Sequence, residues 1–309
     1  MTPMAQRTQD IRIGIIGGTG LGEKLFSGMD PRQVRTHDVD TPFGSPSMPI
    51  ITGMYEDAPI AFLQRHGEGH VINPARIPAR ANVYALKAVG CTHLVVSGAT
   101  GSLREDIAPG DLVICSQLID RTAGRERTFY ERAAVHVEFA EPFCPVMRQW
   151  LIDAAEKIDG TRVHRAGTYI CMEGPSFSTR AEALLYRQWG ADVVGMTALP
   201  EARLAREAEM AYVLVALPTD YDCWRPRAGT ESSEPPRDSL LAEIIGNLNR
   251  ATEASISLIK AGLGDISSLR ETPSPAHDAL RLAIWSDKAK IDPEEVRRLR
   301  LLWGHCFES

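Results

Sequence analysis

The sequence lacks the features that mark several classes of protein. Its six cysteines lie far apart, mostly in apolar stretches, with no C-x-x-C pair and no clustered histidines, which argues against a disulfide framework or a zinc site. No uninterrupted apolar run approaches the roughly 20 residues that span a bilayer. The N-terminus, MTPMAQRTQD, also lacks the apolar core of a signal peptide. We therefore expect buried free thiols in a reducing cytoplasm and no membrane partner.

The sequence also lacks segments rich in charge of one sign. Lys and Arg total 34 and Asp and Glu total 40, giving a formal net charge of -6, without long basic runs. This distribution argues against nucleic acid as a partner, and any anion site must be local. What the chain does have is 44% hydrophobic residues among 309, which is enough to bury a substantial core.

Apolar runs of β type alternate along the chain with helical periodicity. The runs are continuous rather than alternating, which is typical of strands buried on both faces. The pattern predicts an α/β fold with a largely buried sheet, in which ligands gather at the carboxyl ends of strands. The expected strands are 11–16, 47–53, 59–65, 93–98, 111–117, 165–172, 191–196 and 211–218, and the expected helices are 77–89, 145–158, 180–189, 199–209 and 238–261.

The two ends of the chain differ in composition from the rest. Residues 1–10 are polar and are expected to be loose, and a linker-like stretch, GDISSLRETPSPAHD, follows residue 262. Two helical candidates come after it, Ala276 to Lys288 and Pro293 to Trp303. We expect one domain over 11–262 with a C-terminal helical extension over 263–309.

Five of the expected strands end in small, polar or phosphate-competent residues. GGTG at 17–20 offers backbone N–H groups and the Thr19 hydroxyl to an anion. Its glycine spacing does not fit the dinucleotide fingerprint, and a purely structural turn is the alternative. Arg65 and His66 end a second strand, and Arg suits forked contacts with phosphate. The other three ends are SGATGS at 97–102, EGPSFS at 173–178 and GMT at 195–197.

A sixth strand ends in two acids, in the sequence TDYDCW. Asp220 and Asp222 are two residues apart, so in a strand their side chains share one face. Two solvated surface acids are the alternative, but the anion-binding ends nearby indicate a substrate with a phosphate side and a hydrogen-bond-donating side. The polar, Pro-rich segment Arg225 to Pro236 that follows is either a lid or a plain surface loop.

Ten motifs in one order resemble the trimeric purine nucleoside phosphorylases, and most closely the 5'-methylthioadenosine phosphorylases. They are GIIGGTGL, TPFGSPS, RHGEGH, INPARIPARANVYALK, GSLREDIAPGDLV, DRT, AEPFCP, EGPSFSTRAE, GMTALPEA and TDYDCW. The resemblance covers residues 11 to 262 and not the tail. It implies a single-domain phosphorylase/hydrolase-like fold, with a mixed central sheet flanked by helices, and a homotrimer.

Matched motif by motif, the resemblance also implies which residues bind. Phosphate would be held by Thr19, Arg65, His66, the backbone near Gly98 and Ala99, and Thr197. The nucleoside would contact Phe177, Ser178, Met196, Asp220, Asp222, Leu240 and Leu241, and His136 would reach into the neighbouring subunit's site. No metal or organic cofactor is implied, and inorganic phosphate is the co-substrate. Phe177, which would pack on the purine, could by its residue type equally be a core residue.

The chemistry that follows is phosphorolysis of an N-glycosidic bond. The purine leaves as an anion unless it is protonated at N7. Asp220, kept protonated by an apolar strand end and by the like charge of Asp222, would donate this proton, and Asp222 would accept a hydrogen bond from a 6-amino group. Relatives that act on 6-oxopurines carry Asn at the position of Asp220 and Glu at that of Ser178. We therefore expect an adenine-type base.

Three departures from the resemblance keep other nucleosides open. Gly195 occurs where many methylthioadenosine enzymes have Asn, and Gly98 replaces a hydroxyl residue of the phosphate shell. Arg237 falls in the segment that lines the 5' pocket in relatives; we expect it to face solvent, because an unpaired Arg is costly to bury. The substrate could thus be 5'-methylthioadenosine, or instead 5'-deoxyadenosine, adenosine or a 6-oxopurine nucleoside such as inosine.

Overall fold

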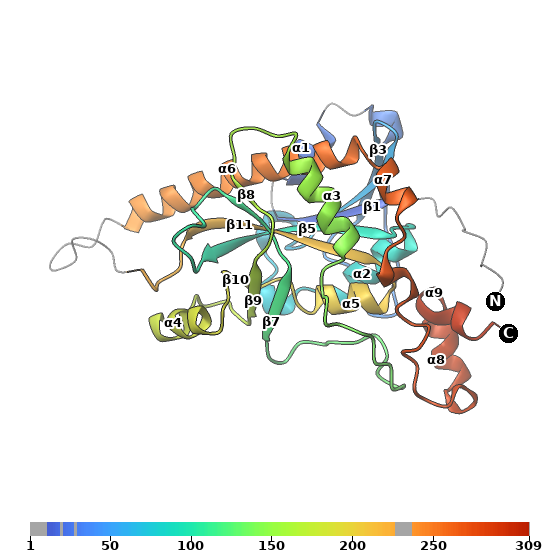
Figure 1. Ribbon diagram of the computed structural model, residues 1–309. Coiled ribbons are helices and arrows are strands. Elements are labelled where there is room, and N and C mark those ends of the chain that lie inside the picture. Colours follow the sequence, from blue (N-terminus) through green and yellow to red (C-terminus); the bar gives the residue numbers. More distant parts are fainter. Residues whose placement is uncertain (1–10, 19–20, 28–29, 226–236, 309) are drawn as a thin grey trace.

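The structure, a computed structural model, describes residues 11–18, 21–27, 30–225 and 237–308, and only the backbone of Glu23, Pro31 and residues 237–240. In this part of the chain one sheet of 11 strands runs through the molecule (Figure 1). The strands are β1 (Ile13–Gly17), β2 (Arg35–His37), β3 (Ile50–Tyr55), β4 (Ala58–Gln64), β5 (His93–Ser102), β6 (Leu112–Ile114), β7 (Gln117–Arg121), β8 (Val163–His164), β9 (Thr168–Met172), β10 (Val193–Gly195) and β11 (Ala211–Tyr221). The helices are α1 (Leu21–Phe26), α2 (Ala79–Ala88), α3 (Pro145–Ala155), α4 (Arg180–Gln188), α5 (Glu201–Glu207), α6 (Arg237–Leu263), α7 (Ser267–Glu271), α8 (Pro293–Arg298) and α9 (Arg300–Trp303).

The sheet is mixed and is organised around the long central strand β5. Parallel neighbours β1 and β11 flank β5, while its last residues pair antiparallel with β10. The order along the main path is β2-β3-β4-β1-β5-β10-β9-β7; off this path, β11 pairs with β5 and β6, and β6 pairs with β8. The expected α/β fold with a mixed central sheet flanked by helices is confirmed. The apolar run 111–117 proved to be part of two short strands, β6 and β7, and the short strands β2 and β8 were missed.

Continuous apolar strands supply two cores, one on each face of the sheet, because successive side chains point to opposite faces. On β1, Ile13 and Ile15 pack with α3 and α6, whereas Ile16 packs with α2 and α5. On β11, Val213 packs with α3 and α6, and Leu214 packs with α2 and α5. Figure 1 shows these two helix layers on opposite sides of the sheet. The strand ends that carry polar residues are therefore held on a scaffold that is packed on both faces.

The C-terminal segment differs from the sequence-based expectation. The expected helix over Ala276–Lys288 is wrong: a short 3₁₀ turn, Pro275–Asp278, is followed by further turns over 279–283 and an isolated bridge at Ile284. The reason is tertiary pairing, since the His136 N–H donates to the Ala283 carbonyl and the Trp285 N–H to that of Ala134, both at 2.9 Å. The expected helix Pro293–Trp303 is present as α8 and α9, which meet at Leu299, and the linker-like stretch contains α7.

This segment belongs to the main hydrophobic core. Trp303 is completely buried and stacks on Tyr130 with ring centroids 4.6 Å apart. Leu280, Leu299 and Leu302 are in the same buried cluster as strands β5 and β11. The division at residue 262 stays a prediction, but the residues beyond it are packed as part of the fold.

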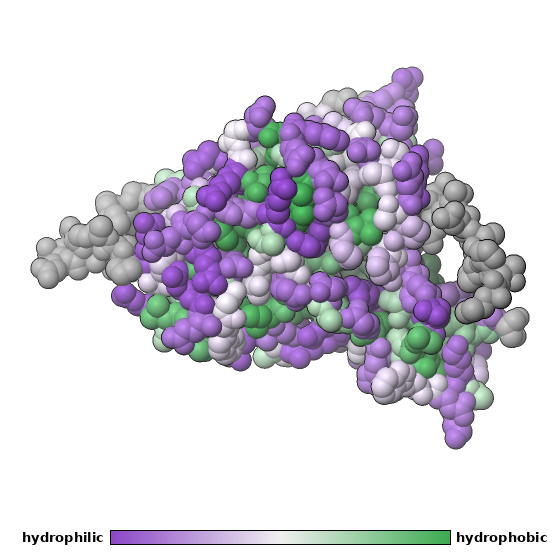
Figure 2. Space-filling view, viewed as in Figure 1, coloured by the Kyte–Doolittle hydropathy of each residue, from purple (hydrophilic) through white to green (hydrophobic). Residues whose placement is uncertain are grey.

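Surface hydropathy is mostly mixed, with apolar side chains gathered over α4 and near the C-terminal helices (Figure 2). On α4 and directly after it, Leu184 and Trp189 are exposed, and in the segment before α8 so are Leu282 and Trp285. No described helix combines the length and the apolar character needed to cross a membrane.

Candidate active site

A hollow of about 400 Å³ opens at the carboxyl ends of β1, β4, β9, β10 and β11, beside the middle of β5. Ten of the residues singled out in the sequence line it together: Arg65, His66, Gly98, Ala99, Phe177, Ser178, Met196, Thr197, Asp220 and Asp222. They come from strand ends that are far apart in sequence, as expected for a ligand site in an α/β fold. Their roles in binding stay predictions.

Two other predicted site residues are not brought to this hollow. Leu241 is 58% exposed and is not part of the lining, and His136 lies outside it with its ring against Trp285, centroids 4.8 Å apart. Thr19 and the side chain of Leu240 lie outside the described residues, as does the side chain of Arg237. The proposed lid, Arg225 to Pro236, likewise falls outside them except for its first residue.

Arg65 forms the buried, charged end of the hollow. It follows β4, is 1% exposed, and its Nε and Nη2 atoms donate to the Glu201 carboxylate at 3.3 and 3.4 Å. Burial lowers the pKa of Arg65, but the charge of Glu201 and its hydrogen bonds outweigh this, and the net shift is upward. Nη1 reaches the Ser97 carbonyl at 3.1 Å and the Thr197 hydroxyl at 3.4 Å. The fork of Nε and Nη2 is thus occupied by Glu201, and Nη1, fixed next to the Thr197 hydroxyl, is the charged group that suits a phosphate oxygen.

His66 presents a neutral ring to the same end. Burial lowers its pKa to about 4, and the nearby charge of Arg65 acts in the same direction. Its Nδ1 lies 2.8 Å from the Ile72 carbonyl, which can only accept, so Nδ1 carries the proton and Nε2 is left as an acceptor. The ring stacks on His70, centroids 4.0 Å apart, and His70 also lines the hollow, which the sequence reasoning missed.

Gly98 leaves little room at this end. A Cβ atom there would lie 3.2 Å from the Thr197 hydroxyl oxygen and 3.6 Å from Arg65 Nη1. The glycine that replaces a hydroxyl residue therefore lets Arg65 and Thr197 sit close to the backbone of β5, where a ligand oxygen can approach.

At the opposite end the two acids follow a β-bulge in β11. The pairing with β5 shifts between Pro218 and Asp220, so Thr219 is the extra residue. Asp220 and Asp222 both line the hollow, which confirms that they share a face. The Asp222 Oδ2 atom is buried and has no hydrogen-bond partner among the described residues. It is an acceptor without a donor, as a site for an amino group requires.

Burial raises the pKa of Asp222, although hydrogen bonds from Cys223 and Ser178 oppose the shift. The environment of Asp222 thus disfavours its charged form. The division that assigns a proton to Asp220 and a charge to Asp222 remains part of the proposed mechanism.

Two further lining residues come from α6, the helix on which the sequence analysis placed Leu240 and Leu241 in the nucleoside site. Leu248 and Thr252 are four residues apart and so share one helix face, toward the hollow. The helical periodicity over 238–261 could have identified this face, but the resemblance pointed only to the first turn of the helix, at Leu240 and Leu241.

Arg125 holds two walls of the site together and was not singled out in the sequence. Its guanidinium donates to the carbonyls of Met196 at 2.7 Å, Leu199 at 2.6 Å and Glu173 at 2.6 Å, and also pairs with the Glu173 carboxylate. Since one side chain bonds both the end of β9 and the turn after β10, it fixes the segments that carry the phosphate-facing and nucleoside-facing residues.

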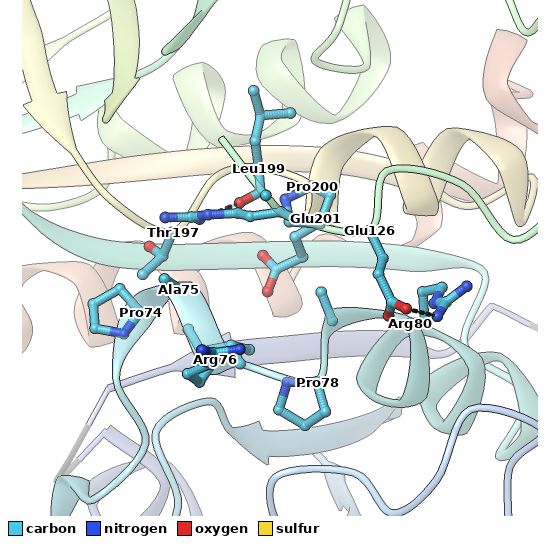
Figure 3. Close-up of a pocket in the computed structure, with 14 residues that line it drawn as sticks. Pro74, Ala75, Arg76, Pro78, Arg80, Glu126, Thr197, Leu199, Pro200 and Glu201 are labelled. Carbon is cyan, nitrogen blue, oxygen red and sulfur yellow. Dashed lines mark hydrogen bonds and ion pairs between the residues drawn. The ribbon is translucent and has the colours of Figure 1, made fainter. Parts of the chain in front are cut away.

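A second hollow of about 210 Å³ adjoins the charged end (Figure 3). Thr197 and Pro74 line both hollows. Figure 3 shows Arg80 ion-paired with Glu126 on its far side. In the described part of the chain no three His, Cys, Asp or Glu side chains gather as a metal site would require.

The fold and the strand-end site define the class of this protein: the chain belongs to the phosphorylase superfamily, whose family model matches residues 12–263. Within this superfamily, the chain is similar to phosphorylases of one name. It is 46% identical over 294 residues to an S-methyl-5'-thioadenosine phosphorylase of Geobacter sulfurreducens, an alignment that covers 94% of this chain and 98% of that protein. A phosphorylase of the same name from Chloroflexus aurantiacus is 46% identical over 297 residues, covering 96% and 98%. These alignments continue past residue 262, so the resemblance is longer than the motifs indicated.

Solved structures agree with this assignment. A methylthioadenosine phosphorylase sourced from an Antarctic soil metagenomic library superposes with a TM-score of 0.85 at 40% identity, covering 95% of this chain and 99% of that one. A double mutant of the adenosine/methylthioadenosine phosphorylase of Schistosoma mansoni, in complex with adenine, has a TM-score of 0.77 at 34% identity, covering 89% and 100%.

Proposed function

We propose that this protein cleaves 5'-methylthioadenosine with phosphate, releasing adenine and 5-methylthioribose 1-phosphate. It is then a pentosyltransferase of methionine and purine salvage. The observation that carries this is one hollow with the buried cation Arg65 at one end and the acids Asp220 and Asp222 at the other. The names of the relatives at 46% identity support the choice of nucleoside.

In the proposed mechanism phosphate is both nucleophile and counter-charge. Held by Arg65 and Thr197, a phosphate oxygen bonds to C1' as the bond from C1' to N9 breaks, and its charge stabilises the cationic ribose. The electron pair of the broken bond goes to the purine, and Asp220 supplies the proton to N7. Asp222 accepts from the 6-amino group, and Met196 meets the ribose. Phosphate is a co-substrate, and no metal or organic cofactor takes part.

A second candidate is adenosine phosphorolysis, which one observation favours. Thr252 places a hydroxyl-bearing residue on the α6 wall beside Leu248, so that wall is not wholly apolar. The Schistosoma mansoni relative is named for both adenosine and methylthioadenosine. The other alternative substrates are 5'-deoxyadenosine and 6-oxopurine nucleosides such as inosine.

We further propose a homotrimer in the cytoplasm. Exposed apolar residues such as Leu282 and Trp285 suit contact between copies, and His136 packs on Trp285 at this surface. Four buried free cysteines are compatible with a reducing compartment. Light scattering coupled to gel filtration would test the trimer, and a monomer at micromolar concentration would contradict it.

The test of the proposed function is phosphate-dependent base release from four nucleosides: 5'-methylthioadenosine, 5'-deoxyadenosine, adenosine and inosine. We expect kcat/KM for methylthioadenosine to lead by at least about tenfold over adenosine, the discrimination that one apolar group in a pocket allows. A lead for adenosine would favour the second candidate, and a lead for inosine would overturn the roles of Asp220 and Asp222. No release without phosphate is the control for hydrolysis.

A further inference from the structure

The β-bulge that precedes the two acids accepts hydrogen bonds from residues that belong to neither β5 nor β11. Thr219, the extra residue, is followed directly by Asp220. The carbonyl of Pro218 accepts from the Gly110 N–H at 2.8 Å, and the carbonyl of Thr219 accepts from Asn247 Nδ2 at 2.7 Å. Two successive carbonyls are therefore satisfied by groups outside this ladder, one of them a side chain of helix α6.

Asn247 is well suited to this role because its amide can adopt only one orientation. The side chain is buried, and its Oδ1 lies 2.5 Å from Arg250 Nη2. A guanidinium only donates, so this atom must be the amide oxygen and the NH₂ group must face Thr219. Arg250 thus selects the orientation in which Asn247 donates to the strand.

The next link runs from Thr219 to the acid. The Thr219 hydroxyl lies 2.8 Å from Asp220 Oδ1 and 3.4 Å from the Thr100 carbonyl, and one hydrogen cannot serve both. The shorter contact to a carboxyl oxygen is the stronger one. Thr219 therefore links the two: Asn247 holds its carbonyl, and its hydroxyl orients the Asp220 carboxyl.

We propose that Asn247 is a positioning residue for the reaction, which acts through Thr219 to aim the Asp220 carboxyl at the base. The inference rests on the proposed function, in which Asp220 is the acid. Helix α6 also presents Leu248 to the hollow, one residue beyond Asn247. The same anchor therefore ties one wall of the nucleoside pocket to the acid.

The experiment compares Asn247→Ala with Asn249→Ala, the same substitution at an exposed position of the same helix. We expect kcat for methylthioadenosine to fall about 10- to 100-fold in the first, the range that a misplaced catalytic group produces. The affinity for a 7-deaza analogue, which lacks the N7 acceptor, should change less than about threefold. Asn249→Ala should match the wild type in both measurements.

Asn247→Asp separates the donated hydrogen bond from packing. It keeps the size of the side chain and the contact with Arg250, but a carboxylate cannot donate to the Thr219 carbonyl. We expect its kcat to be at least as low as that of Asn247→Ala. If these variants do not fold, Arg250→Met, which removes only the group that orients the amide, should lower kcat about two- to tenfold.

Three outcomes would overturn the inference. They are a folded Asn247→Ala enzyme with kcat within twofold of the wild type, loss of analogue affinity in proportion to kcat, and an Arg250→Met enzyme with unchanged kcat when the Asn247 variants do not fold. A wild-type protein that releases no base from any nucleoside would instead reject the proposed function, so the two failures are distinguishable.

Discussion

The two ends of the hollow are built in different ways. At the phosphate-facing end, Arg65 and Glu201 are 1% and 2% exposed and paired to each other, and the Tyr212 hydroxyl donates to Glu201 at 2.8 Å. At the base-facing end, Phe177 is 86% exposed and Asp222 has an oxygen without a hydrogen-bond partner among the described residues. In the described part of the chain, Arg65 and Glu201 of the first end are buried and paired, whereas the second end has a ring left exposed and an oxygen left unpaired that a ligand would cover or pair.

This difference indicates where binding energy and specificity arise. A preorganised charged site does not reorganise when phosphate binds, so its contribution is available in the transition state. An exposed aromatic face and an unpaired acceptor gain contacts on binding, and they discriminate between bases by what is left unpaired. Changes at the two ends should therefore have separable effects on stability, phosphate affinity and base choice.

The largest effect is expected for Asp220→Ala. Removing the group proposed to protonate N7 should lower kcat about 10²- to 10⁴-fold, the usual contribution of general acid catalysis. Asp159→Ala, at an exposed acid outside the hollow, is the control and should not change kcat. Steady-state rates with saturating phosphate give the measurement, and near-normal turnover would remove Asp220 from the role of acid.

Arg65→Met should instead act on stability and phosphate together. It leaves the buried Glu201 carboxylate unpaired, which should destabilise the fold by about 3–5 kcal/mol and raise the KM for phosphate. The double variant Arg65→Met with Glu201→Gln removes the orphaned charge, so it should recover much of the stability without recovering phosphate affinity. Urea denaturation and phosphate titration measure the two effects, and a normal KM in the double variant would contradict the phosphate role.

Asp222→Asn should change which base is accepted rather than the rate for the preferred one. The amide can donate as well as accept, so discrimination against inosine relative to adenosine should fall by about tenfold or more. The ratio of the two kcat/KM values is the measurement. Selectivity equal to that of the wild type would count against the contact between Asp222 and the 6-amino group.

Phe177→Ala tests the exposed aromatic face. Because the ring is mostly in solvent, the free energy of unfolding should change by less than about 0.5 kcal/mol. The nucleoside KM should rise about tenfold, as loss of stacking on a base would give, while the phosphate KM stays the same. A large loss of stability would show that Phe177 is a core residue, the alternative that its residue type left open.

The sequence predicted the elements that local patterns determine and missed those made by distant contacts. Continuous apolar runs identified β1, β4, β5, β9, β10 and β11, and the polar residues at their ends identified most of the hollow. Arg125, Asn247 and Thr252 carried no comparable signal, because their importance lies in which backbone or cavity they meet. The segment around Ile284 was misjudged as a helix for the same reason, since it is held by a bridge to Val135.

The smallest expected effect is on the pH dependence of stability. His66 at the phosphate-facing end and Asp222 at the base-facing end should change the free energy of unfolding with pH in opposite directions. Burial lowers the pKa of His66 from its usual 6.5 to about 4, so its contribution to stability is complete above pH 6.5 and is lost as the pH falls toward 4. Burial raises the pKa of Asp222 above its usual 3.8, so its contribution is complete below pH 3.8 and is lost as the pH rises through the raised pKa. Each group can change the free energy of unfolding by at most about 1.4 kcal/mol per pH unit. Urea denaturation between pH 3.8 and 6.5 should therefore show a shallower rise of stability with pH in His66→Gln and a steeper one in Asp222→Asn, and equal slopes in all three proteins would contradict this contrast.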